Sequence, residues 1–155
     1  MGRASASISV PGRAADAEAL WYDPHRWQAW VDGFGHVISL DDGWPARGAE
    51  LVWQSPPGGR GRVRERVVSY EMRTGQTVEV EDAAMTGRQT VKFEPGPDAV
   101  EVTLSLEYRI KDHTPLTPVV DLLFVRRAWN DALRRTVTRF SNERKAEIQF
   151  GPDLR

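Results

Sequence analysis

The stretch VKFEPGPDAVEVTLSL, residues 91–106, alternates apolar and polar side chains on both sides of a turn rich in proline and glycine. A period of two is typical of a β-strand with one buried face, and the turn predicts that the two strands form an antiparallel hairpin. With Glu94 opposite Ala99, the apolar side chains share one face, and Lys92 lies opposite Glu101 on the other. The stretch therefore predicts an antiparallel sheet with one buried, apolar face and one solvent-exposed, polar face.

The turn AMTG at residues 84–87 extends this sheet toward the N-terminus. With Ala83 opposite Arg88, the valines before the turn join the apolar face, and Glu79 lies opposite Lys92. Opposite charges that pair across neighbouring strands stabilise a sheet. A second, independently placed turn therefore gives the same two faces.

The turn RTGQ at residues 73–76 adds one more strand. With Met72 opposite Thr77, Glu65 and Val67 point to the apolar face, whereas the neighbouring arginines point outward. The alternation fails beyond Val67, where apolar side chains fall on the outer face unless a β-bulge reverses the strand.

The remaining elements follow from simpler patterns. Residues 4–10 alternate as a first strand, and residues 14–22 are rich in helix formers. Asp23 before Pro24 predicts the start of a second short helix, and Gly33 is placed to end it. Residues 36–110 predict a meander of six strands. Residues 117–148 carry apolar side chains at helical spacing, which predicts an amphipathic helix roughly 45 Å long.

Composition limits the classes of function. The chain has 155 residues, a formal net charge of -1 and no cysteine, so there is no basic field for nucleic acid and no disulfide. The first twenty residues lack a long apolar run, so we expect no signal peptide, no membrane span and a cytoplasmic location. We expect one domain over residues 1–150 and a flexible tail at 151–155.

Two motifs carry a family resemblance. Residues 10–37, VPGRAADAEALWYDPHRWQAWVDGFGHV, place a strand ending in proline, a helix, Asp-Pro and a short helix with two tryptophans in succession, and residues 117–129 read TPVVDLLFVRRAW. This order resembles the START-like or SRPBCC superfamily and, within it, the polyketide cyclase/dehydrase-like group. The resemblance implies an α+β helix-grip fold, in which a curved antiparallel sheet of about seven strands grips the long helix.

The resemblance also implies an apolar cavity between sheet and helix, which opens near the short helices. Members of the group include polyketide aromatase/cyclases and carriers of lipids or hormones, so the fold leaves the function open. We expect the protein to bind a small hydrophobic ligand such as a lipid, a polyketide or an aromatic metabolite. The alternatives are an aromatase/cyclase-like enzyme and a protein-interaction module.

Two carboxylates are candidates for catalysis. The register places Glu65 and Asp82 on the inward face of adjacent strands, with Asp82 opposite Val67 and Gln89. Burial in an apolar cavity raises the pKa of a carboxyl group, which then can act as a general acid or base. The expected cavity wall consists of inward-facing side chains of the sheet and the helices: Trp27, Trp30, Leu51, Trp53, Val67, Val80, Gln89, Val91, Leu104, Tyr108, Leu122, Val125 and Trp129.

Other motifs predict less specific roles. The three histidines share no metal-ligand spacing, so we expect no metal site and no cofactor. The run RGRVRER at residues 60–66 places four arginines on one strand face. This face is a candidate surface for an anionic partner such as an acyl-carrier protein. The alternative is pairing with a carboxylate of the next strand and exposure to solvent, which the near-neutral net charge favours. Trp27 and Trp30 are interpreted as a structural corner where the cavity opens.

Overall fold

A computed structural model describes residues 1–112 and 114–150, so the predicted tail at 151–155 lies outside the described residues. Within this part of the chain, seven antiparallel strands form one sheet in the order β1-β7-β6-β5-β4-β3-β2. The strands are β1 (Gly2–Pro11), β2 (His36–Leu40), β3 (Glu50–Gln54), β4 (Arg62–Glu71), β5 (Gly75–Glu81), β6 (Met85–Pro95) and β7 (Ala99–Ile110).

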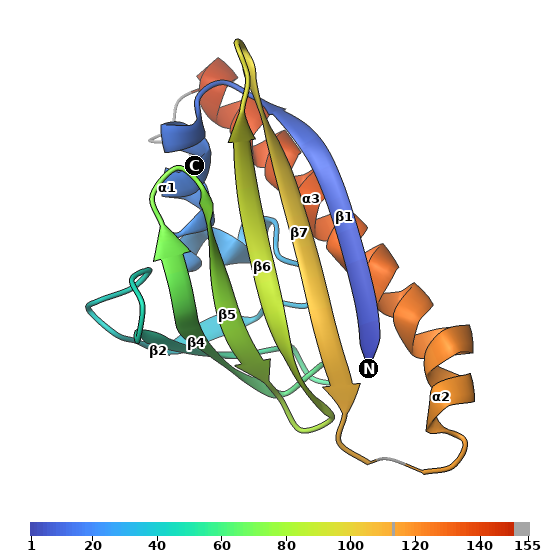
Figure 1. The fold of residues 1–155 in the computed structure, drawn as a ribbon. Helices are drawn as coiled ribbons and strands as arrows, with labels where there is room; N and C mark the ends of the chain where they lie inside the picture. The colour runs from blue at the N-terminus through green and yellow to red at the C-terminus, as the bar shows by residue number, and fades with distance from the viewer. Residues whose placement is uncertain (113, 151–155) are drawn as a thin grey trace.

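The helices lie at the two ends of the chain. After β1 come α1 (Ala14–Trp21) and the 3-10 helix η1 (Pro24–Ala29). The C-terminal helix is continuous but has three parts, α2 (Thr117–Val120), the π-helical turn η2 (Asp121–Val125) and α3 (Arg126–Phe150). Figure 1 shows α3 running diagonally along β1, with α1 beside its C-terminal end. The predicted α+β helix-grip architecture is confirmed.

The predicted start of the second short helix is also confirmed. Asp23 accepts a hydrogen bond from the backbone N–H of His25, and Pro24 occupies the first turn. The helix is 3-10 and ends at Ala29, earlier than the predicted stop at Gly33. Gly33 instead has a φ of 76°, which glycine adopts without steric cost, and turns the chain toward β2.

The predicted faces of the sheet are correct, but the predicted pairings are shifted along the strands. Phe93 pairs with Val102, and Glu94 lies opposite Glu101, so the expected Lys92–Glu101 pair does not form. Glu79 lies opposite Arg88 instead of Lys92. Because each shift is an even number of residues, no side chain changes face.

The expected β-bulge lies between Val67 and Ser69. Val67 before it and Tyr70 after it both pack against the small second cluster formed with Ala49 and Val78. The bulge therefore reverses the strand as the alternation required. It also returns Tyr70 to the inner side, where its ring packs edge-on against Tyr22 at 5.4 Å.

An aromatic group joins the short helices to α3. Trp21, Trp30 and Phe140 are each almost fully buried, and their ring centroids lie 4.6 to 5.0 Å apart. Nearer the start of α3, the backbone N–H of Ser5 in the edge strand β1 donates to Asn130 Oδ1. These contacts fix α3 across the inner face of the sheet.

We expect Phe140→Ala to lower the free energy of unfolding by about 3–5 kcal/mol, because it leaves a cavity between two rigid indole rings. Urea unfolding followed by tryptophan fluorescence measures this change. Thr138→Ala, at an exposed position of the same helix, is the control and should change stability by less than about 0.5 kcal/mol. An equal effect of the two substitutions would contradict the packing role of Phe140.

Candidate functional site

A small, partly open cavity of about 50 Å³ lies between the sheet and α3. Its wall combines tryptophans from the short helices, from β3 and from α3 with inward side chains of β4 to β7. The polar part of the wall contains Asp32, Arg60, Glu65, Gln76, Gln89 and Thr136. A mostly apolar space with a few polar groups is the usual composition of a small-molecule site.

Arg60 lies in the loop before β4 and turns inward. Its guanidinium lies 5.5 Å from the ring centroid of Trp53 and 4.9 Å from that of Trp129, so it is held between two indoles. Its Nε donates to Asp82 Oδ2 at 2.7 Å. The side chain is 22% exposed, which places a cation at the edge of the cavity.

Asp82 holds this arginine in place. The carboxylate is buried, and its Oδ1 accepts hydrogen bonds from the backbone N–H groups of Ala84 and Met85 in the β5–β6 turn. Its other oxygen pairs with Arg60. Asp82 does not line the cavity, and its contacts indicate that it orients the side chain of Arg60.

Glu65 is the buried carboxyl group of the cavity itself. It comes from the middle of β4 and is 4% exposed. Burial raises its pKa above the ordinary value of 4.5, and a hydrogen bond from Trp53 together with the charge of Arg60 opposes this rise. The bond from Trp53 Nε1 to Glu65 Oε2 is 2.8 Å long. Glu65 is thus biased toward the neutral, proton-donating form.

Two further donors in the cavity wall have no acceptor. Among the residues that the structure describes, neither Arg60 Nη2 nor Trp30 Nε1 has a hydrogen-bond partner, although both atoms are buried. Trp30 as a whole is 1% exposed. Buried polar atoms normally have partners, so the wall offers hydrogen-bond donors that the protein itself does not use.

The structure brings many of the predicted cavity residues together. Those that line the cavity are Glu65, Trp27, Trp30, Trp53, Gln89, Val91, Leu104 and Trp129. Gln89 lines the cavity, but the predicted pairing of Gln89 with Asp82 is wrong. Gln89 pairs with Val78 on one side and with Leu106 on the other. The predicted pairing of Asp82 with Val67 is likewise wrong, since Val67 pairs with Val78.

Other predicted wall residues lie elsewhere. Leu51 and Val80 are buried in the main core, and Val67 is buried in the second cluster, all outside the cavity wall. Val125 is half-buried and packs against the core. Leu122 was expected to face inward, but it is 63% exposed.

Tyr108 is buried, but it points to the other end of the sheet. Its hydroxyl donates to the carboxylate of Asp121 in η2, which is also paired with Arg126 at 3.3 Å. Burial and the neighbouring carboxylate raise the pKa of Tyr108 to about 12. This contact fixes the start of the C-terminal helix and lies outside the cavity.

The sequence reasoning missed Arg60 as a cavity residue. Arg60 lies an even number of residues before the outward-facing arginines of β4, so strand alternation predicted that it would also point outward. The alternation does not extend into the loop between β3 and β4, because Gly61 has a φ of 80° and turns the chain before the strand begins. A glycine on each side of Arg60 is the signal that could have revealed this irregular backbone.

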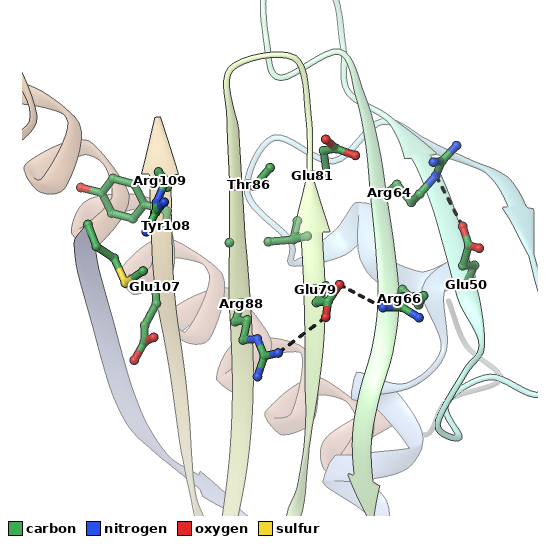
Figure 2. Close-up of a pocket in the computed structure, with 13 residues that line it drawn as sticks. Glu50, Arg64, Arg66, Glu79, Glu81, Thr86, Arg88, Glu107, Tyr108 and Arg109 are labelled. Carbon is green, nitrogen blue, oxygen red and sulfur yellow. Dashed lines mark hydrogen bonds and ion pairs between the residues drawn. The ribbon is translucent and has the colours of Figure 1, made fainter. Parts of the chain in front are cut away.

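The outer face of the sheet carries a wide, open groove of about 860 Å³ (Figure 2). Arg64 pairs with Glu50 at 3.4 Å, and Arg66 and Arg88 both pair with Glu79. Four arginines and four glutamates line the groove, so its charges largely cancel. An acyl-carrier protein on this face stays a prediction, and this balance gives an anionic partner no net attraction.

The part of the chain that the structure describes contains no group of three or more side chains arranged to hold a metal ion. None of its helices has both the length and the apolar character needed to span a membrane.

The sequence matches a family model over residues 1–143, and the family is described as polyketide cyclase/dehydrase and lipid transport. The chain belongs to this family. The predicted family membership is therefore confirmed. No curated protein matches the sequence.

Solved structures of similar fold fit this family membership. A START superfamily protein from Mycobacterium smegmatis has a TM-score of 0.71 and 14% identity, over 94% of this chain and 98% of that one. A protein from Thermus thermophilus has a TM-score of 0.69 and 16% identity, over 93% and 97%. Truncated norcoclaurine synthase from Thalictrum flavum has a TM-score of 0.64 and 16% identity, over 91% of each chain. At these identities the likeness concerns the fold alone.

The buried carboxyl of this family member predicts a pH dependence of stability. Because the pKa of Glu65 is raised on folding, the folded protein holds the proton more tightly than the unfolded chain. This stabilisation is complete below pH 4.5 and is lost as the pH rises through the raised pKa, with a slope of up to about 1.4 kcal/mol per pH unit. Glu65→Gln keeps an acceptor for Trp53 and should remove this slope.

Urea unfolding at a series of pH values measures the effect. Glu101→Gln, on the exposed side of β7, is the matched control and should leave the slope unchanged. If Glu65→Gln shows the same pH dependence as the unsubstituted protein, the buried carboxyl is not protonated on folding and the assignment fails.

Proposed function

We propose that the protein binds a small, largely apolar molecule between the sheet and α3, and that this molecule carries a neutral acceptor oxygen. The observation that carries the proposal is the set of donors in one cavity wall. Trp30 Nε1 and Arg60 Nη2 lack partners among the described residues, and Glu65 is biased toward its protonated form. Donors without acceptors in a buried site favour a ligand that supplies the acceptor.

The charge balance favours a neutral oxygen over an anion. Asp82 neutralises Arg60 through a direct ion pair, and burial disfavours the ionised form of Glu65. Asp32, which also lines the cavity, is paired with Arg135 and Arg139. The charges of the cavity wall are therefore largely balanced. A ligand carboxylate would bring an uncompensated charge into a low-dielectric space, which is costly. A ketone, aldehyde or quinone oxygen accepts the same hydrogen bonds without that cost.

The present cavity has room for only one or two water molecules, at about 30 Å³ each. A larger ligand therefore requires side chains to move, and Arg60 and Trp129 are partly exposed at the cavity edge. The family's description includes lipid transport. A norcoclaurine synthase of similar fold was solved with dopamine and hydroxybenzaldehyde, the latter an aromatic carbonyl compound. Both support the binding of a small molecule.

A pair of matched probes tests the proposal. Acetophenone and ethylbenzene have similar shapes, but only acetophenone carries an acceptor oxygen. We expect acetophenone to bind about tenfold more tightly, which is the effect of a hydrogen bond to a charged or buried donor. Titration of the tryptophan indole N–H signals by NMR measures both affinities, and benzoate should bind more weakly than acetophenone.

Trp30→Phe provides the control, because it removes one donor and keeps an aromatic ring. Because the smaller ring also changes the packing around the cavity, the readout is the ratio of the two affinities, and the preference for acetophenone should fall severalfold. Equal affinities of the two probes, or no binding of either, would rule out a cavity that selects ligands with an acceptor oxygen.

The raised pKa of Glu65 also favours a second candidate function, proton transfer to a bound carbonyl oxygen. A buried acid with a raised pKa can donate its proton to a ketone oxygen while water removes a proton from the α-carbon, which gives the enol. In this reading Glu65 is a general acid and Asp82 positions Arg60 beside it. Enolisation would be the first chemical step of the aromatase/cyclase-like alternative.

Exchange of the methyl hydrogens of acetophenone with deuterium from solvent tests this second function. We expect exchange to be accelerated by the protein and reduced at least tenfold by Glu65→Gln, whereas acetophenone binding is retained. Exchange at the uncatalysed rate, with binding intact, would leave a binding protein that is not an enzyme.

A further inference from the structure

The start of the C-terminal helix exposes an unusual amount of apolar surface. Six side chains between positions 116 and 124 are 44% to 69% exposed, whereas the other exposed large apolar side chains of the described residues are scattered over the molecule. Contiguous exposed apolar patches mark interaction sites in soluble proteins. We call the following set the outer helix face: Leu116, Val119, Val120, Leu122, Leu123 and Phe124.

The orientation of this helix segment is fixed by polar contacts. Asp121 is turned toward the sheet, where it accepts a hydrogen bond from the buried Tyr108 and pairs with Arg126. Val125, one residue beyond Phe124, packs against the core. The polar side of the segment therefore faces the protein and its apolar side faces outward, the reverse of an ordinary surface helix.

The width of the outer helix face indicates what covers it. At about 100° per residue, its six positions span more than half of the helix circumference. The π-helical turn η2 contributes three successive exposed residues, 122 to 124. A helix that binds in a protein groove uses a narrower stripe at positions i, i+3, i+4 and i+7. A lipid surface, in contrast, surrounds every protruding side chain.

The charges beside the outer helix face are mainly positive. Among the described residues from 109 to 127, four are basic and two are acidic. Arg126 is paired with the buried Asp121 and Lys111 with Glu81, so Arg109 and Arg127 carry the unbalanced positive charge. Arg127 is exposed on the turn that follows the face. Figure 1 shows α2 at one end of the molecule, beside the N-terminus. Apolar side chains flanked by arginine match the surface of an anionic bilayer.

We propose that the outer helix face docks on anionic lipid bilayers, with its apolar side chains inserted at the level of the headgroups and Arg127 at the phosphates. This docking does not depend on the proposed content of the cavity. This mode of binding requires no membrane-spanning segment.

The absence of cysteine from the sequence allows a single introduced label. Leu123→Cys and the control Met72→Cys, an exposed apolar position on another part of the surface, are each labelled with the environment-sensitive dye NBD. Vesicles of phosphatidylcholine alone are compared with equimolar phosphatidylcholine and phosphatidylglycerol. We expect the label at position 123 to brighten and shift to the blue with the mixed vesicles, and the label at position 72 to remain unchanged.

Unlabelled variants separate the two contributions in a vesicle flotation assay. Leu122→Ser with Phe124→Ser should weaken binding to mixed vesicles at least tenfold. Arg127→Glu should weaken it about tenfold and make it less sensitive to salt. Both variants should keep the unfolding temperature of the unsubstituted protein, because the replaced side chains are exposed.

Three outcomes would overturn the proposal. One is the absence of flotation with the mixed vesicles. Another is an equal response of the labels at positions 72 and 123. The third is self-association in sedimentation that the double serine variant abolishes, without vesicle binding, because the outer helix face would then be an interface between two copies of the chain.

Discussion

The packing of three aromatic side chains fixes the geometry on which the cavity depends. Trp21, Trp30 and Phe140 come from α1, the end of η1 and α3, and each ring contacts the other two. Rigid rings in mutual contact leave few alternative arrangements. They join the short helices to α3 at one end of the sheet and leave only about 50 Å³ beside them. Because Trp30 belongs to both the aromatic group and the cavity wall, the packing also fixes the position of its indole N–H, which has no hydrogen-bond partner among the described residues.

The sequence predicted the sheet well because alternation tolerates error. A pairing that is wrong by two or four residues leaves every side chain on its face, so Glu65 was placed inward although Val80, and not the predicted partner, lies opposite it. Neighbours across strands do not survive such shifts. The supposed neighbours of Asp82 were therefore wrong, and the carboxylate instead holds Arg60. Irregular backbone, such as the loop that turns Arg60 inward, has no period from which side-chain direction can be predicted.

The arginines of the sequence illustrate how little a charge pattern alone decides. Arg64 and Arg66 lie on the outer face and pair with Glu50 and Glu79, in contacts exposed enough to contribute little to stability. Arg60, two residues before the strand begins, is partly buried and held between two indoles. The same side chain thus belongs to a self-neutralised surface in one case and to the candidate site in the other. Only the backbone of the preceding loop distinguishes them.

The helix periodicity failed at Leu122 for an energetic reason. A rotation that buried this leucine would gain about 1.5–3 kcal/mol. It would also withdraw Asp121 from Tyr108, and a buried hydroxyl without a partner costs about 1–3 kcal/mol, with more for the carboxylate that loses its contacts. The polar contacts therefore decide the orientation, and the leucine is exposed as a consequence. The outer helix face, kept exposed by these polar contacts, has no partner among the described residues. Its width and the positive charge beside it fit a lipid surface.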